Sequence, residues 1–481
     1  MAPSLLRLAP LGLLALPLLL LLARGAPLLP STLRDLDVVG ASLGLAALGT
    51  SLTLLAGLGL AAAAWLGRVG SLWEGVLLLG YLVPPFVTGM GLLFSFQTFG
   101  VGIQGVPGIL LAWILHYTPL AYLLLKPQAK VALGLIAAAR VHGVTGLRAL
   151  RVLLPPLLPP LAVAGGTLYL ALLGNFGVPA VLGTPAGVYV LPTLAYARLL
   201  SPFGTDPLGQ AAALGIWLAL LALPALVLAR PATLEPRESL LPPAGPFYRL
   251  AYILYTLLAL GLTLLGLLRE ALQNPYTGAL QPAFAQALAL PLVRAGLSNS
   301  FLLALFATLT LLALALALRP FPQALRQTRS LFDLYYLLPG TLLGLGLILL
   351  LAPTPLYGTP WILFLAYLLN FAALALRALE SGPKVEGAVA VGRVHGLSPW
   401  RAWWRLGYPL LWPSAFAGSF LIFPLAFAEI TLSALLYAPG AETIGVAVLS
   451  ALSGGLYREA AALGLLLMGF SALGLLGRPR W

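Results

Sequence analysis

Two stretches of the chain carry the same basic, imidazole, glycine and proline residues at a constant offset of 253 positions. In order, the shared residues are Arg140, His142, Gly143, Arg148 and Pro156 in the first copy, and Arg393, His395, Gly396, Arg401 and Pro409 in the second. No acid, cysteine or hydroxyl stands beside them at a spacing typical of nucleophilic or metal chemistry. The pattern therefore predicts a cationic surface that docks a soluble partner, present twice.

The local sequence predicts that each copy is a pair of short helices. Gly143 and Gly396 follow helical patterns and are placed where a left-handed residue ends a helix. Thr145 and Ser398 stand two residues later and favour N-caps of a second helix. The alternative is a pair of helices lying on anionic lipid. Two copies with matching histidines and glycines favour docking, because lipid anchoring does not require them.

A few polar residues fall within strongly apolar stretches. Asn175, Asn370 and Glu429 are candidates for lining a transport pathway, since polar groups inside a membrane usually face an interior. The alternative role for all three is hydrogen bonding between helices. His116 is interpreted as a hydrogen-bonded residue of the bundle. The chain has no phosphate-binding loop of the G-x-x-x-x-G-K-[ST] type and no metal-ligand spacing. We therefore expect no catalytic residue, no metal and no cofactor bound by this chain.

The elements that position these residues are predicted to be membrane spans. Of the 481 residues 60% are hydrophobic and only 8% are charged, far from the composition of soluble domains. Spans of about 20 apolar residues are predicted near 8–23, 39–66, 72–95, 106–125, 157–176, 207–229, 249–268, 297–318, 331–352, 360–378, 410–437 and 457–477. The fold class is therefore all-α, a polytopic membrane protein of about twelve transmembrane helices in two parallel six-span repeats.

The distribution of charge predicts the orientation. Twenty of the 26 lysine and arginine residues fall in loops on one side, which the positive-inside rule assigns to the cytoplasm. Both termini are then cytoplasmic, in a cell membrane. The +13 net charge reflects topology and gives no basic patch on a soluble domain, so no nucleic-acid partner is expected.

The repeat divides the chain into two halves. The first half covers residues 1–230 with its loop at 127–156, and the second covers 249–481 with its loop at 380–409. Residues 231–248 are polar and rich in proline, and are predicted to be a cytoplasmic linker.

The repeated loop resembles the EAA loop of binding-protein-dependent ABC importer permeases. The family pattern is Glu-Ala-Ala, three residues, a glycine and then a helix that ends in a Leu-Pro step. Gly143 and Gly396 match the glycine, and Pro156 and Pro409 match the proline. The Arg-Val-His before each glycine resembles the branch with two fused permease halves that transports iron(III). The motif's glutamate is absent, since Ala137 and Ala390 occupy its place.

The resemblance implies a non-catalytic permease subunit of an inner membrane. Its partners would be a pair of ABC ATPase subunits, which bind the ATP, and an extracytoplasmic substrate-binding protein. The implied substrate is iron(III), moved to the cytoplasm by alternating access. Thiamine, phosphonate and polyamine permeases are alternatives, as is a secondary transporter of the major facilitator type. That last class fits poorly because the loop between the second and third spans holds only one charge, Arg68.

Overall fold

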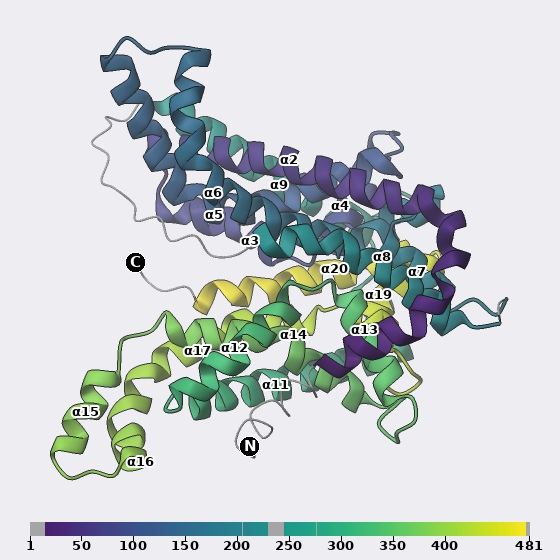
Figure 1. The fold of residues 1–481 in the computed structure, drawn as a ribbon. Coiled ribbons are helices and arrows are strands. Elements are labelled where there is room, and N and C mark those ends of the chain that lie inside the picture. Colours follow the sequence, from purple (N-terminus) through teal and green to yellow (C-terminus); the bar gives the residue numbers. More distant parts are fainter. Residues whose placement is uncertain (1–14, 204, 229–244, 276, 478–481) are drawn as a thin grey trace.

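The computed structural model describes residues 15–203, 205–228, 245–275 and 277–477. These residues form a bundle of helices without a β-strand (Figure 1). Nine helices in the described ranges are long and apolar enough to cross a membrane, or as many as twelve if each of three bent helix pairs counts as one span. The predicted all-α, polytopic membrane fold is therefore confirmed.

The helices of the first half follow a helical stretch at 15–25. They are η1 Ala26–Asp35, α2 Leu36–Gly67, α3 Ser71–Leu82, α4 Pro85–Thr98, α5 Val106–Val141, α6 Leu147–Leu173, η2 Pro179–Gly183, η3 Thr184–Ala186, α7 Leu191–Leu199 and α8 Pro207–Leu228.

The helices of the second half come in a similar order. They are α9 Pro246–Leu272, α10 Phe284–Ala289, α11 Pro291–Leu318, α12 Pro322–Leu337, α13 Gly340–Leu351, α14 Pro360–Glu380, α15 Glu386–Val394, α16 Pro399–Ala402, η4 Trp403–Gly407, α17 Tyr408–Phe427, α18 Thr431–Leu436, α19 Ile444–Ser453, α20 Tyr457–Ala472 and η5 Leu473–Gly477. The start of α7 and the start of α19 are separated by 253 residues, the offset of the repeated loop.

Each half contains a span broken near its middle by proline. Val83 and Leu338 both precede a proline and adopt extended backbone angles, because the proline ring disfavours the helical region for the residue before it. As a result α3 and α4 meet at 95°, and α12 and α13 at 111°. These breaks bring backbone ends into the interior of the bundle.

The first helix of each half bridges both halves. In the second half, α9 packs so closely on α4 that a Cβ at Gly266 would lie 2.0 Å from the carbonyl oxygen of Gly91. Near the N-terminus, the stretch 15–25 packs on α13 so closely that a Cβ at Gly346 would lie 2.8 Å from the carbonyl oxygen of Pro17. Figure 1 shows α9 beside α2 and α4, and the N-terminal stretch crossing toward α13. The two halves are therefore joined along two helices.

Several predicted span boundaries were wrong. The first two predicted spans belong to one helical run over 15–67, because the intervening segment forms the 3₁₀ helix η1. The fourth span continues as α5 to Val141, and the eleventh ends at Phe427. The bent pair over 179–199 was not predicted as membrane-embedded. Residues 8–14 of the first predicted span, residues 231–244 of the predicted linker and residues 229–230 at the end of the first half lie outside the described residues.

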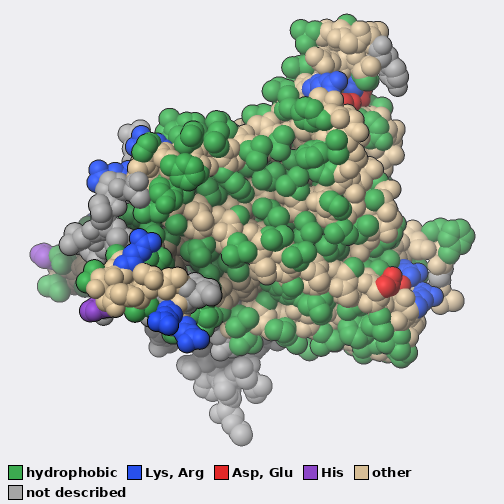
Figure 2. Space-filling model, turned by 90° about the horizontal axis from the view of Figure 1, so that it is seen from above, with side chains coloured by type: hydrophobic (Ala, Val, Ile, Leu, Met, Phe, Trp, Pro, Cys, Tyr) green, Lys and Arg blue, Asp and Glu red, His purple; other side chains and the backbone are tan. Residues whose placement is uncertain are grey.

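The repeated loops project from one end of the bundle. Figure 1 shows the tip between α5 and α6 and the tip between α15 and α16 at the same end, on opposite flanks. Figure 2 shows a broad hydrophobic face between two ends where lysines and arginines gather, with the visible histidines at the end that carries the tips. We call residues 127–156 the first hairpin and residues 380–409 the second hairpin.

Candidate functional site

A central cavity of about 210 Å³ lies between the α3–α4 break of the first half and the segment between α17 and α18 of the second half. Its wall includes Val83 and Pro84 from the α3–α4 break and Ala428 from the end of α17. The three predicted pathway residues, Asn175, Asn370 and Glu429, and also His116, all line this cavity. The structure thus brings together residues that are far apart in the sequence. The sequence analysis missed Pro84, although a Pro-Pro pair inside an apolar stretch could have indicated the break.

Asn175 organises one side of the cavity through its side-chain amide. Its Oδ1 accepts hydrogen bonds from Trp113 Nε1 at 3.3 Å and from the Val178 backbone N–H at 3.0 Å. Its Nδ2 donates to the hydroxyl of Tyr117 at 2.8 Å. Asn175 therefore holds α5 against the start of η2. Asn175 thus lines the cavity and also bonds between helices, while its role in a transport pathway stays a prediction.

Glu429 occupies a similar place at the end of α17. Its two carboxylate oxygens accept from the backbone N–H groups of Leu432 at 2.8 Å and Ser433 at 3.0 Å. Backbone N–H groups at a helix start stabilise a negative charge. The Ser433 hydroxyl also contacts Tyr367 of α14. Glu429 is the only carboxylate among the described residues that line the cavity, and no lysine or arginine is among them.

His116 and Asn370 complete the polar lining. The imidazole of His116 is buried, with Nδ1 3.3 Å from the hydroxyl of Thr88 and its ring packed against Tyr117. The hydrogen bond agrees with the predicted role of His116 in the bundle. No three His, Cys, Asp or Glu side chains of the described residues gather in a way that could hold a metal ion.

A second cavity of about 400 Å³ lies toward the end opposite the hairpins, between α7 and α19. Its polar lining consists of neutral side chains, among them Gln97, Tyr189 and Tyr457. Phe176 lines this outer cavity, while its neighbours Asn175 and Gly177 line the central one. The buried Phe176 ring, which packs on Tyr196 at 5.1 Å, therefore stands between the two cavities.

The hairpin tips have the predicted helix-ending glycines. Gly143 and Gly396 have φ of +72° and +83°. The following N–H groups close the turn, from Val144 to the Ala139 carbonyl and from Leu397 to the Gly392 carbonyl. This is the hydrogen-bond pattern of a left-handed helix terminator.

The caps differ between the copies. The Ser398 hydroxyl accepts from the Arg401 N–H, as predicted. The cap predicted at Thr145 was wrong, because Gly146 with φ of +59° follows it and α6 starts only at Leu147.

The prolines that match the family pattern also differ in setting. Pro409 lies in the first turn of α17, after the π-helical turn η4. Pro156 stands near the start of the candidate span Leu154–Leu173 but lies inside a helix, because α6 has already begun at Leu147. In the first half the short helix and the span form one helix.

Each tip presents an apolar side chain surrounded by basic ones. Val141 and Val394 occupy equivalent positions and are each 84% exposed. The predicted docking residues around them are exposed as well: Arg140, His142 and Arg148 in the first hairpin, and Arg393, His395 and Arg401 in the second. The two tips thus expose the same apolar side chain at matching positions of the repeat. The sequence analysis did not single out these valines.

Glu386 lies four residues before Ala390, which occupies the place of the motif's glutamate, and its carboxylate is already paired within the chain. It begins α15 and pairs with Arg319 at the end of α11, with 3.1 Å between Oε1 and Nη2. The second hairpin is thereby tied to its own half.

Comparison with known proteins gives two findings. Residues 54–237 match the protein family described as "Binding-protein-dependent transport system inner membrane component". The chain is also 28% identical over 186 residues to proteins named "Putative 2-aminoethylphosphonate transport system permease protein PhnV" from Salmonella typhimurium, Salmonella choleraesuis and Salmonella paratyphi A, an alignment that covers 37% of this chain and 69% of each relative. No solved structure matches the chain.

Proposed function

We propose that the chain is the permease subunit of a binding-protein-dependent ABC importer, as its similarity to that family supports, and that its two hairpins couple ATP hydrolysis on a separate pair of ATPase subunits to opening of the central cavity. In this proposal the hairpins face the cytoplasm of a cell with the protein in its inner membrane, and both termini are cytoplasmic. The chain itself binds no cofactor, and ATP binds the partner subunits.

One observation carries the proposal: α5 is a single helix from the cavity to the hairpin. His116 and Tyr117 line the cavity, and the same helix continues to Val141 at the tip. At 1.5 Å per residue this is a lever of about 38 Å. Movement of the tip therefore reaches the cavity wall without an intervening hinge of loop residues.

The mechanism follows from two hairpins at one end of the bundle, the first continuous with α5 and the second joined to α14 through the connector 381–385. ATP binding closes the ATPase pair and draws the hairpins together, and the halves rock so that the outer cavity opens to a binding protein. Hydrolysis lets the hairpins separate and returns the central cavity to the cytoplasm. ATP must favour the outward state by several kcal/mol for the population to shift decisively.

The tip chemistry supports docking of a protein. Val141 and Val394 would insert into apolar pockets of the two ATPase subunits, and the surrounding arginines and histidines would pair with acidic groups at the rim. A glutamate in place of either valine would carry its charged carboxylate into such a pocket, where the loss of hydration is costly.

The docking experiment substitutes these valines. Val141→Glu and Val394→Glu, each in the full complex, are expected to weaken co-purification of the ATPase and lower substrate-stimulated ATP hydrolysis. Val101→Glu is the control, because Val101 is 49% exposed and lies away from both hairpins. Normal association and hydrolysis in both hairpin variants would favour helices that lie on lipid.

For the substrate we propose iron(III), delivered by an extracytoplasmic binding protein. The support is the resemblance of the Arg-Val-His-Gly loops to the iron(III) branch, together with Glu429 as the one acidic or basic side chain among the described residues that line the cavity, His116 aside. A second candidate, 2-aminoethylphosphonate, is favoured by the names of the Salmonella relatives. Its ammonium group is also compatible with Glu429.

Uptake measurements separate the two candidates. Deleting the gene is expected to lower ferric iron uptake and leave 2-aminoethylphosphonate and thiamine uptake intact. Loss of 2-aminoethylphosphonate uptake alone would assign the phosphonate to this permease and leave the coupling proposal unchanged.

A further inference from the structure

Ion pairs connect the same two elements in each half: the arm of the broken span before the proline, and the helix that leads to the hairpin. In the first half, α3 is joined to α5 by the Glu74 Oε1 to Lys126 Nζ contact of 2.6 Å. The buried Tyr122, one turn before Lys126, donates its hydroxyl to the same carboxylate oxygen at 3.0 Å. Glu74 is thus held from α5 by two groups.

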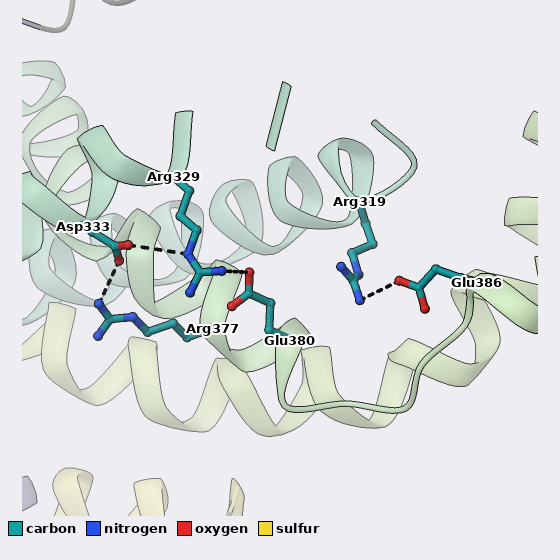
Figure 3. A network of polar contacts seen from close by, with 6 residues as sticks. All are labelled: Arg319, Arg329, Asp333, Arg377, Glu380 and Glu386. Atoms are coloured by element: carbon teal, nitrogen blue, oxygen red, sulfur yellow. Dashed lines mark hydrogen bonds and ion pairs between the residues drawn. The ribbon is translucent and has the colours of Figure 1, made fainter. Parts of the chain in front are cut away.

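In the second half, α12 is joined to α14 by a network of four charges (Figure 3). Arg377 of α14 donates to Asp333 of α12 at 2.8 Å, and Arg329 of α12 donates to Glu380 of α14 at 2.7 Å. Arg329 also reaches Asp333 across one helical turn. Figure 3 shows these four side chains converging between the two helices, while Arg319 and Glu386 form a separate pair.

We call the Glu74–Lys126 pair and the Asp333–Arg377–Arg329–Glu380 network the two clamps. They use different residues at different positions of the repeat. At the offset of 253, Glu74 corresponds to Gln327 and Lys126 corresponds to Leu379, so neither position keeps its charge. What recurs is the pair of elements that is bridged, α3 with α5 and α12 with α14. A connection that is kept while its residues change points to a requirement for the connection itself.

The first clamped arm ends at the central cavity, and the second ends next to it. From Glu74, α3 runs eight residues to Leu82, about 12 Å along the helix, and Leu82, Val83 and Pro84 line the cavity. From Asp333, α12 leads to Pro339, and a Cβ at Gly174 would lie 2.9 Å from the Pro339 Cα. Gly174 directly precedes Asn175, so this arm abuts the other side of the cavity.

We infer that the Glu74–Lys126 clamp and the Asp333–Arg377–Arg329–Glu380 clamp transmit movement of the hairpins to the two proline breaks, of which the one at Pro84 lines the central cavity and the one at Pro339 abuts Gly174 beside it. The inference rests on the proposed coupling function and adds positioning residues to it. When α5 or α14 is drawn by its hairpin, the ion pairs carry α3 or α12 along, and the break at Pro84 or Pro339 changes its angle. Without the clamp, the hairpin moves while the arm stays behind, and hydrolysis no longer opens the cavity.

Charge reversal in the first half tests this in the complete complex of permease, ATPase subunits and substrate-loaded binding protein, reconstituted in vesicles. Glu74→Lys and Lys126→Glu are each expected to lower the amount of substrate transported per ATP hydrolysed by about tenfold, a typical size for coupling between sites. The double variant Glu74→Lys/Lys126→Glu restores the pair and is expected to recover most of the coupling. A purely structural role would lower transport and hydrolysis in proportion and leave their ratio unchanged.

Milder variants and a matched control accompany the reversals. Glu74→Gln and Asp333→Asn keep the side-chain size and remove the charge, and each is expected to lower the ratio even if a reversed variant fails to fold. Arg34→Glu, an exposed reversal in η1 that lies outside both hairpins and both clamps, is expected to leave the ratio unchanged. If the unmodified complex shows substrate-stimulated hydrolysis and transport while Glu74→Gln and Asp333→Asn keep the normal ratio, the clamps do not transmit the movement. If the unmodified complex itself shows no stimulated hydrolysis, the proposed function fails instead.

Discussion

A single amide, that of Asn175, fixes the geometry on one side of the cavity. It joins Trp113 and Tyr117 of α5 to the backbone of Val178, at the point where the chain leaves the helix α6. Buried donors that lose their acceptor keep the full cost of desolvation. The stability of this junction therefore depends on one side chain more than on the apolar residues around it.

Asn175→Ala should lower the thermal stability of the purified permease. Trp113 Nε1 and the Val178 N–H would both lose their acceptor, at about 1–3 kcal/mol for each buried group. The measurement is the midpoint of thermal unfolding followed by tryptophan fluorescence. Asn370→Ala is the control, since Asn370 lines the same cavity and no hydrogen bond of its side chain is described. Equal midpoints for the two variants would argue against the amide as the organising group.

The helices show what the sequence could predict and what it could not. Apolar runs, the repeated loop and the helix-ending glycines were sufficient for the membrane spans and for both tips, because these features depend on local composition and backbone freedom. The length of α5 was not predicted, since Lys126 and Pro127 suggested a helix end that tertiary packing overrides. The meeting of Asn175, Asn370 and Glu429 depends on how broken spans from both halves pack, which no local pattern contains. The half boundaries near 230 and 249 stay a prediction.

Gly396→Val should lower both transport and stimulated ATP hydrolysis by changing the shape of the second hairpin tip. Valine at φ of +83° costs about 1–2 kcal/mol and re-aims α16 relative to α15. We expect an inserted protein whose transport and stimulated ATP hydrolysis fall together, with Gly143→Val acting alike. Gly387→Val is the matched control in the same hairpin, because its φ is not in the left-handed region and a Cβ there meets no atom within 4 Å. Unchanged hydrolysis and transport in both tip variants would show that the tips are not the coupling element.

Across the bundle, the two halves are held together by shared helices as well as by facing surfaces. α9 lies between α4 of the first half and α20 of its own half, where a Cβ at Gly464 would lie 3.1 Å from Leu267. The stretch 15–25 lies between α13 of the second half and α8 of its own, with Leu21 near Gly215. Any rocking of the halves must therefore bend or slide these two helices.

Gly266→Val should destabilise the contact between the halves. Its Cβ would lie 2.0 Å from the Gly91 carbonyl oxygen, and overpacking of this kind costs about 1–3 kcal/mol. We expect a lower unfolding midpoint in detergent than for the unmodified protein. Gly261→Val, on the same helix with no atom within 4 Å of its Cβ, should unfold at the normal temperature. A normal midpoint for Gly266→Val would mean that α9 can move away from α4 at little cost.

The orientation of the bundle can be tested by labelling, because the chain has no native cysteine. Cysteines at Thr145 and Ser398 should react with an impermeant maleimide only after the cytoplasmic face is exposed, as the basic asymmetry requires. A cysteine at Phe203, which is 89% exposed and lies outside both hairpins, should react in intact cells. Labelling of either hairpin cysteine in intact cells would reverse the assigned topology.

The position of α9 also bears on how the protein is made. Synthesis runs from the N-terminus, so α4 is inserted long before the ribosome has translated residues 246–272. During that interval the groove around Gly91, shaped to accept a helix backbone, faces lipid or a membrane chaperone. The N-terminal stretch likewise waits for α13 before it finds its partner. The first half of the nascent chain is thus left incomplete until the second half arrives, and its final packing is a post-insertion step.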